Sequence, residues 1–525
     1  MAEITLYDST CRDGSQAEGV SFTVEDKLNI AQKLDELGVH LIEGGFPFSN
    51  DKDIAFFKAI RNRKLKQARI AAFGSTRRAK LKAEEDPGLK ALLDAETPVV
   101  TLVGKSWDMH VTDVLRVSPD DNLAMIADSC RYMKEQGREV IFDAEHFYDG
   151  YKSNPEYALK CLQAAAEGGA DCLVLCDTNG GSVPSEVEEI TAAMAKALDT
   201  PLGFHGHNDS GCGVANTLAA VRGGAVHVQG TINGLGERTG NADLCQIIPN
   251  LQLKLGKRCM PDENMKRLTE VSRYMAELAN VPPDDGQPYV GRKAFAHKGG
   301  LHVDAIRKNT RTYEHVPPES VGNARRVLLS ELSGAATMLE KLEKQELTGD
   351  KAVMKQALKE LQRLENMGYQ FEAAEASFTL LVKRILGKEE KFFDLQGFRV
   401  IVEKRGHTEE PITEATIKIR VGEQEELTAS EGDGPVNALD GALRKALERF
   451  YPGLKEMHLV DYKVRIINPD AATGARVRVV IESRDRDDIW GTVGVSENLV
   501  EASWQALVDS VMYKLSKDKT KSKNG

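Results

Sequence analysis

Three short polar segments contain side chains that could together hold a divalent cation. They are DSTCRDG at residues 8–14, HGHND at residues 205–209 and NGLGERTGN at residues 233–241. Each segment follows an apolar run that is typical of a buried strand. Two imidazoles, a carboxylate and an amide oxygen are a suitable ligand set for a catalytic Mn²⁺, Mg²⁺ or Zn²⁺ ion. The predicted ligands are Asp13, His205, His207 and Asn241.

The spacing of the two histidines is informative only in its context. On a strand, His205 and His207 point to the same face, because alternate side chains do so. An H-x-H pair is otherwise more often a structural pair that bonds to its neighbours. A position at the end of a strand, with an acid on an adjacent strand, favours the metal site instead. The glycines around Leu235 lack the order GxGxxG, which favours a tight turn over a phosphate loop.

Other polar residues near the predicted strand ends could act on a substrate. Arg12 is suited to binding a carboxylate or polarising a carbonyl oxygen, although a salt bridge inside the protein is an equal alternative. Glu43, Glu145 and Asp177 lie where an acid/base group would be placed, and Thr178 could donate a hydrogen bond to a substrate. Any of these acids could instead pair with a neighbouring Arg or Lys.

Eight short apolar runs in the first half of the chain position these residues. They begin at Ile4, Val39, Arg69, Pro98, Glu139, Cys172, Pro201 and His227. Helical stretches lie between them, and several end at a glycine, as a helix C-terminus often does. Eight strand–helix units in about 260 residues predict a TIM (β/α)8 barrel of the α/β class. A doubly wound open sheet is the alternative, although it rarely contains eight such regular units.

A closed barrel would bring the predicted ligands together. Its eighth strand pairs with its first, so the strands before Asp13, His205 and Asn241 are neighbours. Active sites of TIM barrels lie at the carboxyl ends of the strands, where all of these polar residues are found.

The pattern changes after Pro261. Residues 264–280 and 326–347 have helical periodicity, and a charged helix pair follows at about 350–390. Strand-like alternation returns after Gly397 with two helices between the strands, which is typical of an α+β domain with antiparallel strands. The predicted parts are a barrel at 1–266, a mainly helical connecting region at 267–394, an α+β domain at 395–516 and a disordered tail at 517–525.

The composition excludes several other classes of protein. The 525 residues include 69 Lys+Arg and 80 Asp+Glu, and a net charge of −11 gives no electrostatic footprint for nucleic acid. There is no apolar run of about 18 residues and no signal-peptide pattern at the start, so we expect no membrane segment and no secretion. The eight cysteines, none with CxxC spacing, favour reduced thiols in a cytoplasmic protein.

The polar segments resemble motifs of a known enzyme family. DSTCRDGSQ, HGHND and GLGERTGNA, together with GLHVDAIRK at 300–308 and GDGPVNALDGALRKAL at 432–447, are similar to motifs of the α-isopropylmalate, homocitrate and citramalate synthases. The likeness covers essentially the whole chain. Ser9, Cys11 and Ser15 depart from the usual first motif, but its Arg-Asp-Gly core is intact.

This resemblance implies a metal-dependent Claisen condensation of acetyl-CoA with a 2-oxo acid, followed by hydrolysis of the thioester. Such enzymes are acyltransferases that convert the acyl group into an alkyl group on transfer. The resemblance implies that Arg12 binds the oxo acid, and that Glu145, His302 and Tyr313 take part in acid/base steps. The connecting region would then complete the active site.

The resemblance also indicates the substrate. Segments such as FGSTRRAK and TLVGKSWDMHV are most similar to family members that use pyruvate and form citramalate, in isoleucine biosynthesis. Phe73 or Phe142, with Trp107 and Phe147 nearby, could narrow the pocket to admit a methyl group and exclude an isopropyl group. The alternatives are a 2-isopropylmalate synthase, which would use 2-oxoisovalerate, and, from another class, a metal-dependent TIM-barrel lyase of the aldol type.

The C-terminal part resembles the allosteric domain of these synthases. By analogy, we expect isoleucine as its effector and a homodimer as the assembly. A purely structural dimerisation domain is the alternative.

Overall fold

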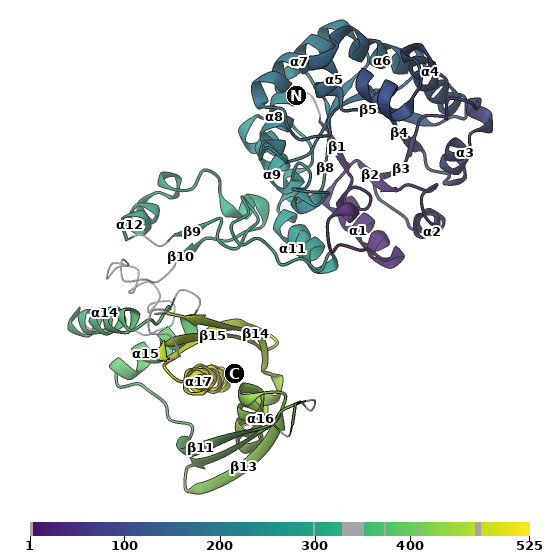
Figure 1. Ribbon diagram of the computed structural model, residues 1–525. Helices are drawn as coiled ribbons and strands as arrows, with labels where there is room; N and C mark the ends of the chain where they lie inside the picture. Colours follow the sequence, from purple (N-terminus) through teal and green to yellow (C-terminus); the bar gives the residue numbers. More distant parts are fainter. Residues whose placement is uncertain are drawn as a thin grey trace. The chain divides into compact units, whose positions relative to one another are not determined.

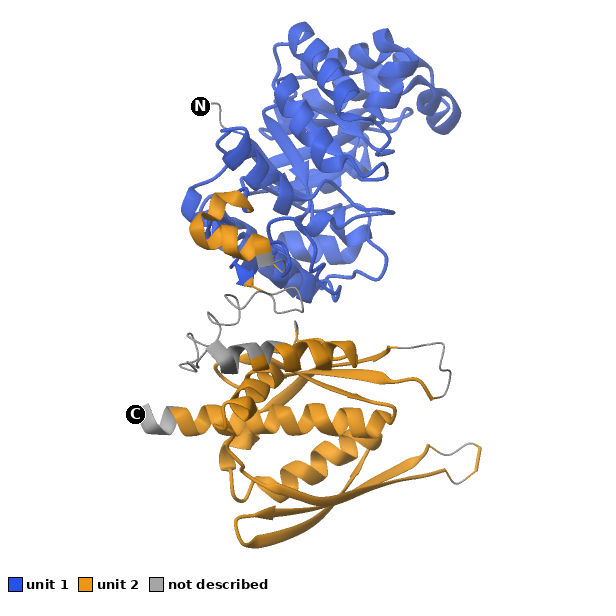
Figure 2. Ribbon diagram, turned by 90° about the vertical axis from the view of Figure 1, so that its left-hand side faces the viewer, with its two compact units in different colours: residues 1–296, 314–326 blue, residues 297–313, 327–525 orange. Residues whose placement is uncertain are grey.

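A computed structural model shows how the predicted elements are arranged (Figure 1). It describes residues 4–297, 300–327, 351–371, 374–404, 406–407, 410–467 and 474–524. The chain forms two compact units, and each is described by itself (Figure 2). Unit 1 contains residues 1–296 and 314–326, and unit 2 contains residues 297–313 and 327–525.

Unit 1 is built on a closed barrel of eight parallel strands in sequence order, which confirms the predicted TIM barrel. The eight strands are β1 (Thr5–Asp8), β2 (Leu41–Gly45), β3 (Arg69–Ser75), β4 (Val99–Lys105), β5 (Glu139–Glu145), β6 (Cys172–Asp177), β7 (Leu202–Gly206) and β8 (His227–Gly230). Because β1 pairs with both β2 and β8, the segments after β7, β8 and β1 are neighbours at one end of the barrel.

Helices surround the barrel in the ring seen in Figure 1. The helices of unit 1 are α1 (Val24–Leu37), α2 (Asp51–Ile60), α3 (Pro87–Asp94), α4 (Pro119–Glu135), α5 (Phe147–Ser153), α6 (Pro155–Glu167), α7 (Pro184–Ala197), α8 (Gly213–Gly223), α9 (Leu244–Pro249), α10 (Asp262–Met265) and α11 (Leu268–Leu278). Local sequence fixes their ends: Thr23 and Asp26 form a capping box at the start of α1, and Gly38 ends it in the left-handed conformation.

Successive side chains of each strand point to opposite faces of the barrel wall, so the wall separates two apolar layers. One set of side chains, including Leu41, Val99 and Val174, fills the inside of the barrel. A larger set, which includes Phe142 and Phe147, packs between the strands and the surrounding helices. On β5, Ile141 and every second residue from it therefore face the barrel interior, whereas the residues between them face the helices.

Unit 2 contains two three-stranded antiparallel sheets with helices packed on them, which confirms the predicted α+β domain. Its main elements are α12 (Gly300–Lys308), α14 (Lys351–Asn366), α15 (Glu375–Ile385), β11 (Asp394–Glu403), β12 (Ile412–Val421), β13 (Gln424–Gly432), α16 (Pro435–Leu447), β14 (His458–Ile466), β15 (Val477–Arg484), β16 (Ile489–Ser496) and α17 (Leu499–Asn524). Leu361 on α14 and Phe378 on α15 pack in one cluster with Val493 and Val495 on β16.

Two expectations for the second half need comment. The predicted disordered tail is wrong for residues 517–524, because α17 continues to Asn524. Lys517 pairs with Asp485 at 3.1 Å, and Lys519 pairs with Glu390 at 2.8 Å, so the lysine-rich end is held by ion pairs. The predicted helix at 326–347 lies almost entirely outside the described residues, and its first two residues form the short strand β10 (Arg326–Val327).

Two further observations concern the whole chain. All eight cysteines are free, as predicted. Among the described residues, no helix has the length and the apolar character needed to cross a membrane. The predicted boundaries after residues 266 and 394 stay predictions.

Candidate functional site

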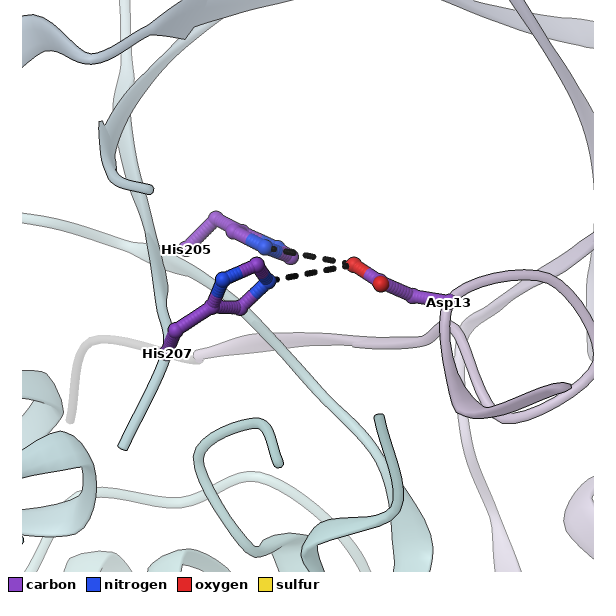
Figure 3. Close-up of side chains that lie close together, drawn as sticks. All are labelled: Asp13, His205 and His207. Carbon is purple, nitrogen blue, oxygen red and sulfur yellow. Dashed lines mark ion pairs between the residues drawn. The ribbon is translucent and has the colours of Figure 1, made fainter. Parts of the chain in front are cut away.

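Asp13, His205 and His207 converge at the carboxyl end of the barrel (Figure 3). Asp13 follows β1, His205 lies on β7, and His207 lies directly beyond the end of β7. Asp13 Oδ2 is 3.4 Å from His205 Nε2 and 3.6 Å from His207 Nε2. All three side chains are buried, and among the described residues they form the one cluster of acidic, His or Cys side chains with the geometry of a metal site.

Hydrogen bonds from the far side of each ring orient the two histidines. His205 Nδ1 is 3.0 Å from Gln229 Oε1, and His207 Nδ1 is 2.8 Å from the carbonyl oxygen of Thr178. The oxygen of the Gln229 amide only accepts hydrogen bonds, so Nδ1 of His205 carries the hydrogen. The lone pair of His205 Nε2 is therefore free on the side that faces Asp13, which is the arrangement expected of a metal-binding histidine. His207 Nδ1 also lies 2.7 Å from Arg238 Nη2.

The glycine-rich segment after β8 brings Asn241 to the same place. Asn241 forms an isolated antiparallel bridge with His207, and its backbone nitrogen donates to Gly234 O at 3.0 Å. A Cβ atom on Gly240 would lie 2.0 Å from that carbonyl oxygen, and a Cβ on Gly236 would lie 2.2 Å from the Asn241 side chain. The glycines are thus required by a tight turn, as predicted.

Two buried atoms at this site lack a partner. Asn241 Nδ2 donates to Leu235 O at 3.2 Å, but its Oδ1 has no hydrogen-bond partner among the residues that the structure describes. The same holds for His207 Nε2. A buried acceptor without a partner is costly unless something else satisfies it. The predicted ligand set therefore fits a divalent cation.

The charges around the site keep Asp13 ionised. Burial alone would raise its pKa, but the positive charge of Arg12 outweighs burial and holds the pKa well below its usual range. Arg12 Nη1 lies 3.4 Å from Asp13 Oδ2. Burial lowers the pKa of His205 to about 4, so this ring is neutral near pH 7 and able to act as a ligand.

A second carboxylate, Glu43 on β2, fixes the position of Arg12. Arg12 Nε donates to Glu43 Oε2 at 2.6 Å, Tyr7 OH donates to Oε1 at 2.7 Å, and Ser9 Oγ also donates to Oε2. The guanidinium group lies over the ring of Phe73, 4.0 Å from its centroid. With three donors on its carboxylate, Glu43 orients Arg12, in place of the acid/base role that its position at a strand end predicts.

The remaining predicted residues at the strand ends fall into two groups. Glu145, at the end of β5, pairs with Lys105 at the end of β4. Thr178 Oγ1 accepts a hydrogen bond from the backbone nitrogen of His146 at 2.9 Å, so its hydroxyl hydrogen remains available. Asp177 instead bonds to Ser182 Oγ at 3.1 Å, on the helix side of β6, and its role is structural.

The structure distinguishes the aromatic residues that could narrow a pocket. Phe73 lies at the site, under Arg12. Phe142 and Phe147 are fully buried among the helix-facing side chains, so the expectation that they line the pocket is wrong. Trp107 stacks on His110 at 5.2 Å between ring centroids, in the loop after β4.

His302 and Tyr313 belong to unit 2. Their rings stack with centroids 4.0 Å apart. The metal-site residues belong to unit 1. A role for this pair at the metal site stays a prediction.

Comparisons with known proteins agree with this architecture. Residues 3–275 match the HMGL-like family, residues 289–368 match the homocitrate synthase post-HMGL domain-like family, and residues 372–515 match the LeuA allosteric (dimerisation) domain. The barrel with its candidate metal site thus defines an enzyme of the HMGL-like class.

Full-length relatives narrow the class further. The chain is 57% identical to the (R)-citramalate synthase of Geobacter sulfurreducens over 98% of both chains, and 55% identical to that of Aquifex aeolicus over 99% of both. It is 50% identical to that of Synechocystis sp., over 97% of this chain and 96% of that one. The chain belongs to the family of (R)-citramalate synthases.

Proposed function

We propose that this protein condenses acetyl-CoA with pyruvate and hydrolyses the resulting thioester to release CoA and (R)-citramalate. The observation that carries the proposal is the likeness to the citramalate synthases over 98% of the chain, with the buried Asp13–His205–His207 cluster in place. A relative from Methanopyrus kandleri named as a probable 2-isopropylmalate synthase is only 32% identical, so pyruvate is favoured over 2-oxoisovalerate.

The proposed metal ligands are Asp13, His205, His207 and Asn241, and the ion is Mn²⁺, Mg²⁺ or Zn²⁺. When bound, such an ion would polarise the keto group of the oxo acid.

Arg12 binds the oxo acid and stabilises the negative charge that develops on its keto oxygen. Its guanidinium group is held from one side by Glu43 and covered by Phe73, so it needs little reorganisation during the reaction. The free hydroxyl hydrogen of Thr178 is suited to donate to the substrate carboxylate.

Glu145 accepts a proton from the methyl group of acetyl-CoA, and the enolate carbon attacks the keto carbon. Water then adds to the thioester carbonyl, the carbon–sulfur bond breaks, and CoA leaves as the thiol. His302 and Tyr313, which stack on each other, are proposed to exchange protons in these steps.

The C-terminal domain is proposed to bind isoleucine and to join two copies of the chain. The support is the match of residues 372–515 to the LeuA allosteric (dimerisation) domain.

The test is the release of free thiol from acetyl-CoA with a panel of 2-oxo acids and a divalent cation. We expect kcat/KM to be highest for pyruvate and at least about tenfold lower for 2-oxoisovalerate, since one or two carbons in a tight pocket change binding by about 1–3 kcal/mol each. A preference for 2-oxoisovalerate would support the isopropylmalate alternative. Thiol release that needs no oxo acid would contradict both.

A further inference from the structure

A lysine lies beside the proposed base at the carboxyl ends of two neighbouring barrel strands. Lys105 is the last residue of β4 and Glu145 is the last residue of β5, and the register of the two strands places them opposite each other. Lys105 Nζ forms an ion pair with Glu145 Oε2. The two side chains are 23% and 24% exposed, so a substrate can reach the pair although most of each side chain is withdrawn from bulk water.

Strand parity shows that the pair faces the interior of the barrel. Val99 on β4 and Ile141 on β5 fill the barrel interior. Lys105 and Glu145 each follow at an even number of residues along the same strand, so their side chains point to the same face. The ion pair therefore lies at the open end of the barrel interior.

The pair shares its surroundings with residues of the candidate metal site. Cys176 lies inside the barrel, where burial raises the pKa of its thiol. The charges of Glu145, Arg12 and Asp13 all act on the same thiol. Glu145 thus faces the space around which Arg12 and Asp13 are found, as a base for a substrate held there must.

The backbone under the pair is fixed on both strands. The carbonyl oxygen of Glu145 accepts hydrogen bonds from Ser106 N at 3.3 Å and from Ser106 Oγ at 2.7 Å. The carbonyl oxygen of Lys105 accepts from Asn122 Nδ2 at 2.9 Å. His146, directly after Glu145, has a left-handed φ of 56°, a strained conformation that persists only where the surroundings impose it. The two strand ends therefore hold the pair in one geometry.

The two carboxylate oxygens of Glu145 differ in their contacts. Oε2 pairs with Lys105, whereas Oε1 makes no hydrogen bond to any residue that the structure describes. A glutamate side chain held at one oxygen keeps its other oxygen in a defined direction, and the rotamer freedom that it loses is lost before the substrate binds. Oε1 is thus the oxygen suited to take a proton from a substrate.

We propose that Lys105 is a positioning residue, which holds Glu145 at Oε2 and so directs Oε1 at the methyl group of acetyl-CoA. When the methyl carbon–hydrogen bond breaks, its proton goes to Oε1 and its electron pair forms the enolate. Lys105 keeps its hydrogens throughout. The inference rests on the proposed function, because it assigns the residue that prepares the base of that reaction.

The experiment compares K105M with the matched variant K134M. Methionine is close to lysine in length but has no charge, and Lys134 pairs with Asp171 at 2.8 Å in the same barrel. Asp171 directly precedes β6, so this second pair lies at the opposite end of the barrel. A third variant, K105R, keeps a positive charge at residue 105.

Thiol release is measured with acetyl-CoA and with acetyl-CoA deuterated on its methyl group, at saturating pyruvate. KM for pyruvate and the melting temperature are measured alongside. For K105M we expect kcat to fall about 100-fold, the usual size of the loss when a catalytic group is misdirected, with KM for pyruvate and the melting temperature unchanged. The deuterium isotope effect on kcat should be at least as large as in the wild type, because proton abstraction is the step that slows. K105R should recover part of the lost kcat, and K134M should match the wild type throughout.

Three results would overturn the inference. A raised KM for pyruvate with an unchanged kcat in K105M would mean that Lys105 binds the oxo acid instead. A smaller isotope effect would place the loss in a later step, and an equal loss of kcat in K134M would mean that any buried-end lysine pair of the barrel matters as much. If wild-type protein released no thiol with any 2-oxo acid, the proposed function itself would fail, which is a distinct result.

Discussion

The two units bury their charged groups in different ways. In unit 1, Arg12, Asp13, Glu43 and two histidines are packed together at one end of the barrel, where burial lowers the pKa of His205 and the charge of Arg12 outweighs burial to lower the pKa of Asp13. In unit 2, the described core is apolar, and charged side chains such as Lys514 and Asp485, which lie 3.1 Å apart, belong to a small set of ion pairs with Lys517 and Asp518. Desolvated charges are costly unless they are paired, so their concentration marks unit 1 as the place of the chemistry.

The largest effect is expected when one of two buried aspartates in the barrel is changed, because one of them is ionised and the other is neutral. Asp13→Asn removes the charge of a proposed metal ligand, and we expect kcat to fall by at least about a thousandfold with the fold retained. The matched control is Asp143→Asn. Burial, and then the charge of Glu43, raise the pKa of Asp143 to about 8, so its carboxyl group is already neutral at pH 7.

We therefore expect Asp143→Asn to keep kcat within about threefold of the wild type, since an amide replaces a neutral acid of the same shape. Steady-state kinetics and circular dichroism of both variants make the comparison. Equal losses in the two variants would mean that the site depends on packing and not on the charge of Asp13.

Removing most of unit 2 tests whether inhibition by isoleucine depends on that unit. A chain that ends at residue 327 should release thiol from acetyl-CoA and pyruvate but should no longer be inhibited by isoleucine. The cut lies upstream of α14, because α14 and α15 pack with β16 and would be left exposed by a cut near residue 395. Inhibition curves of both chains give the result, and isoleucine inhibition that survives the truncation would place the effector site in unit 1.

A smaller effect is expected from the group that orients His205. Gln229 Oε1 accepts from His205 Nδ1, while Gln229 Nε2 donates to Asp143 Oδ1 at 3.0 Å. Gln229→Leu should weaken metal binding about 10- to 100-fold, as loss of an outer hydrogen bond to a ligand generally does. Activity titrated with Mn²⁺ should shift to higher metal concentration and approach the wild-type maximum. A lower maximum at unchanged metal affinity would contradict a purely orienting role.

The smallest expected effect is on the pH dependence of the free energy of unfolding. Native Asp143 holds its proton up to about pH 8, whereas the unfolded chain loses it near the ordinary value of 3.8. The native state therefore binds more protons between these values, and the contribution of Asp143 to stability is lost as the pH rises through this window. The slope is at most about 1.4 kcal/mol per pH unit.

Asp143→Asn lacks this titration, so its stability relative to the wild type should increase from about pH 5 to about pH 8. Urea midpoints at the two pH values measure the difference. A constant difference would show that Asp143 does not titrate between them.

Local motifs were enough to predict that Asp13, His205 and His207 lie together, but not which side chains surround them. Asp13 and the H-x-H pair follow strands whose order in a barrel is fixed, so their convergence followed from the topology. Phe142 could have been excluded by strand parity alone, because Glu145 and Asp143 share one face and Phe142 lies on the other. The sequence analysis predicted that Phe142 and Glu145 both lie at the site. Because their positions on the strand have opposite parity, their side chains point to opposite faces, and only one of them can face the site.

Other features depend on contacts that no local pattern encodes. Glu43 was visible as an acid at a strand end, but the convergence of Tyr7, Ser9 and Arg12 on it depends on the packing of two strands. The pairing of Lys105 with Glu145 arises from the register of β4 and β5. The end of α17 looked disordered by composition, and ion pairs with residues far along the chain keep it helical.

The most direct test of the central claim is metal dependence combined with ligand substitution. Protein stripped with a chelator is titrated with Mn²⁺, and bound metal and thiol release are measured in the wild type and in Asn241→Leu. We predict one ion bound per chain, activity that returns in proportion to it, and weaker binding in Asn241→Leu, whose side chain has no oxygen to offer. Stripped protein with a kcat near that of the untreated enzyme would contradict the account.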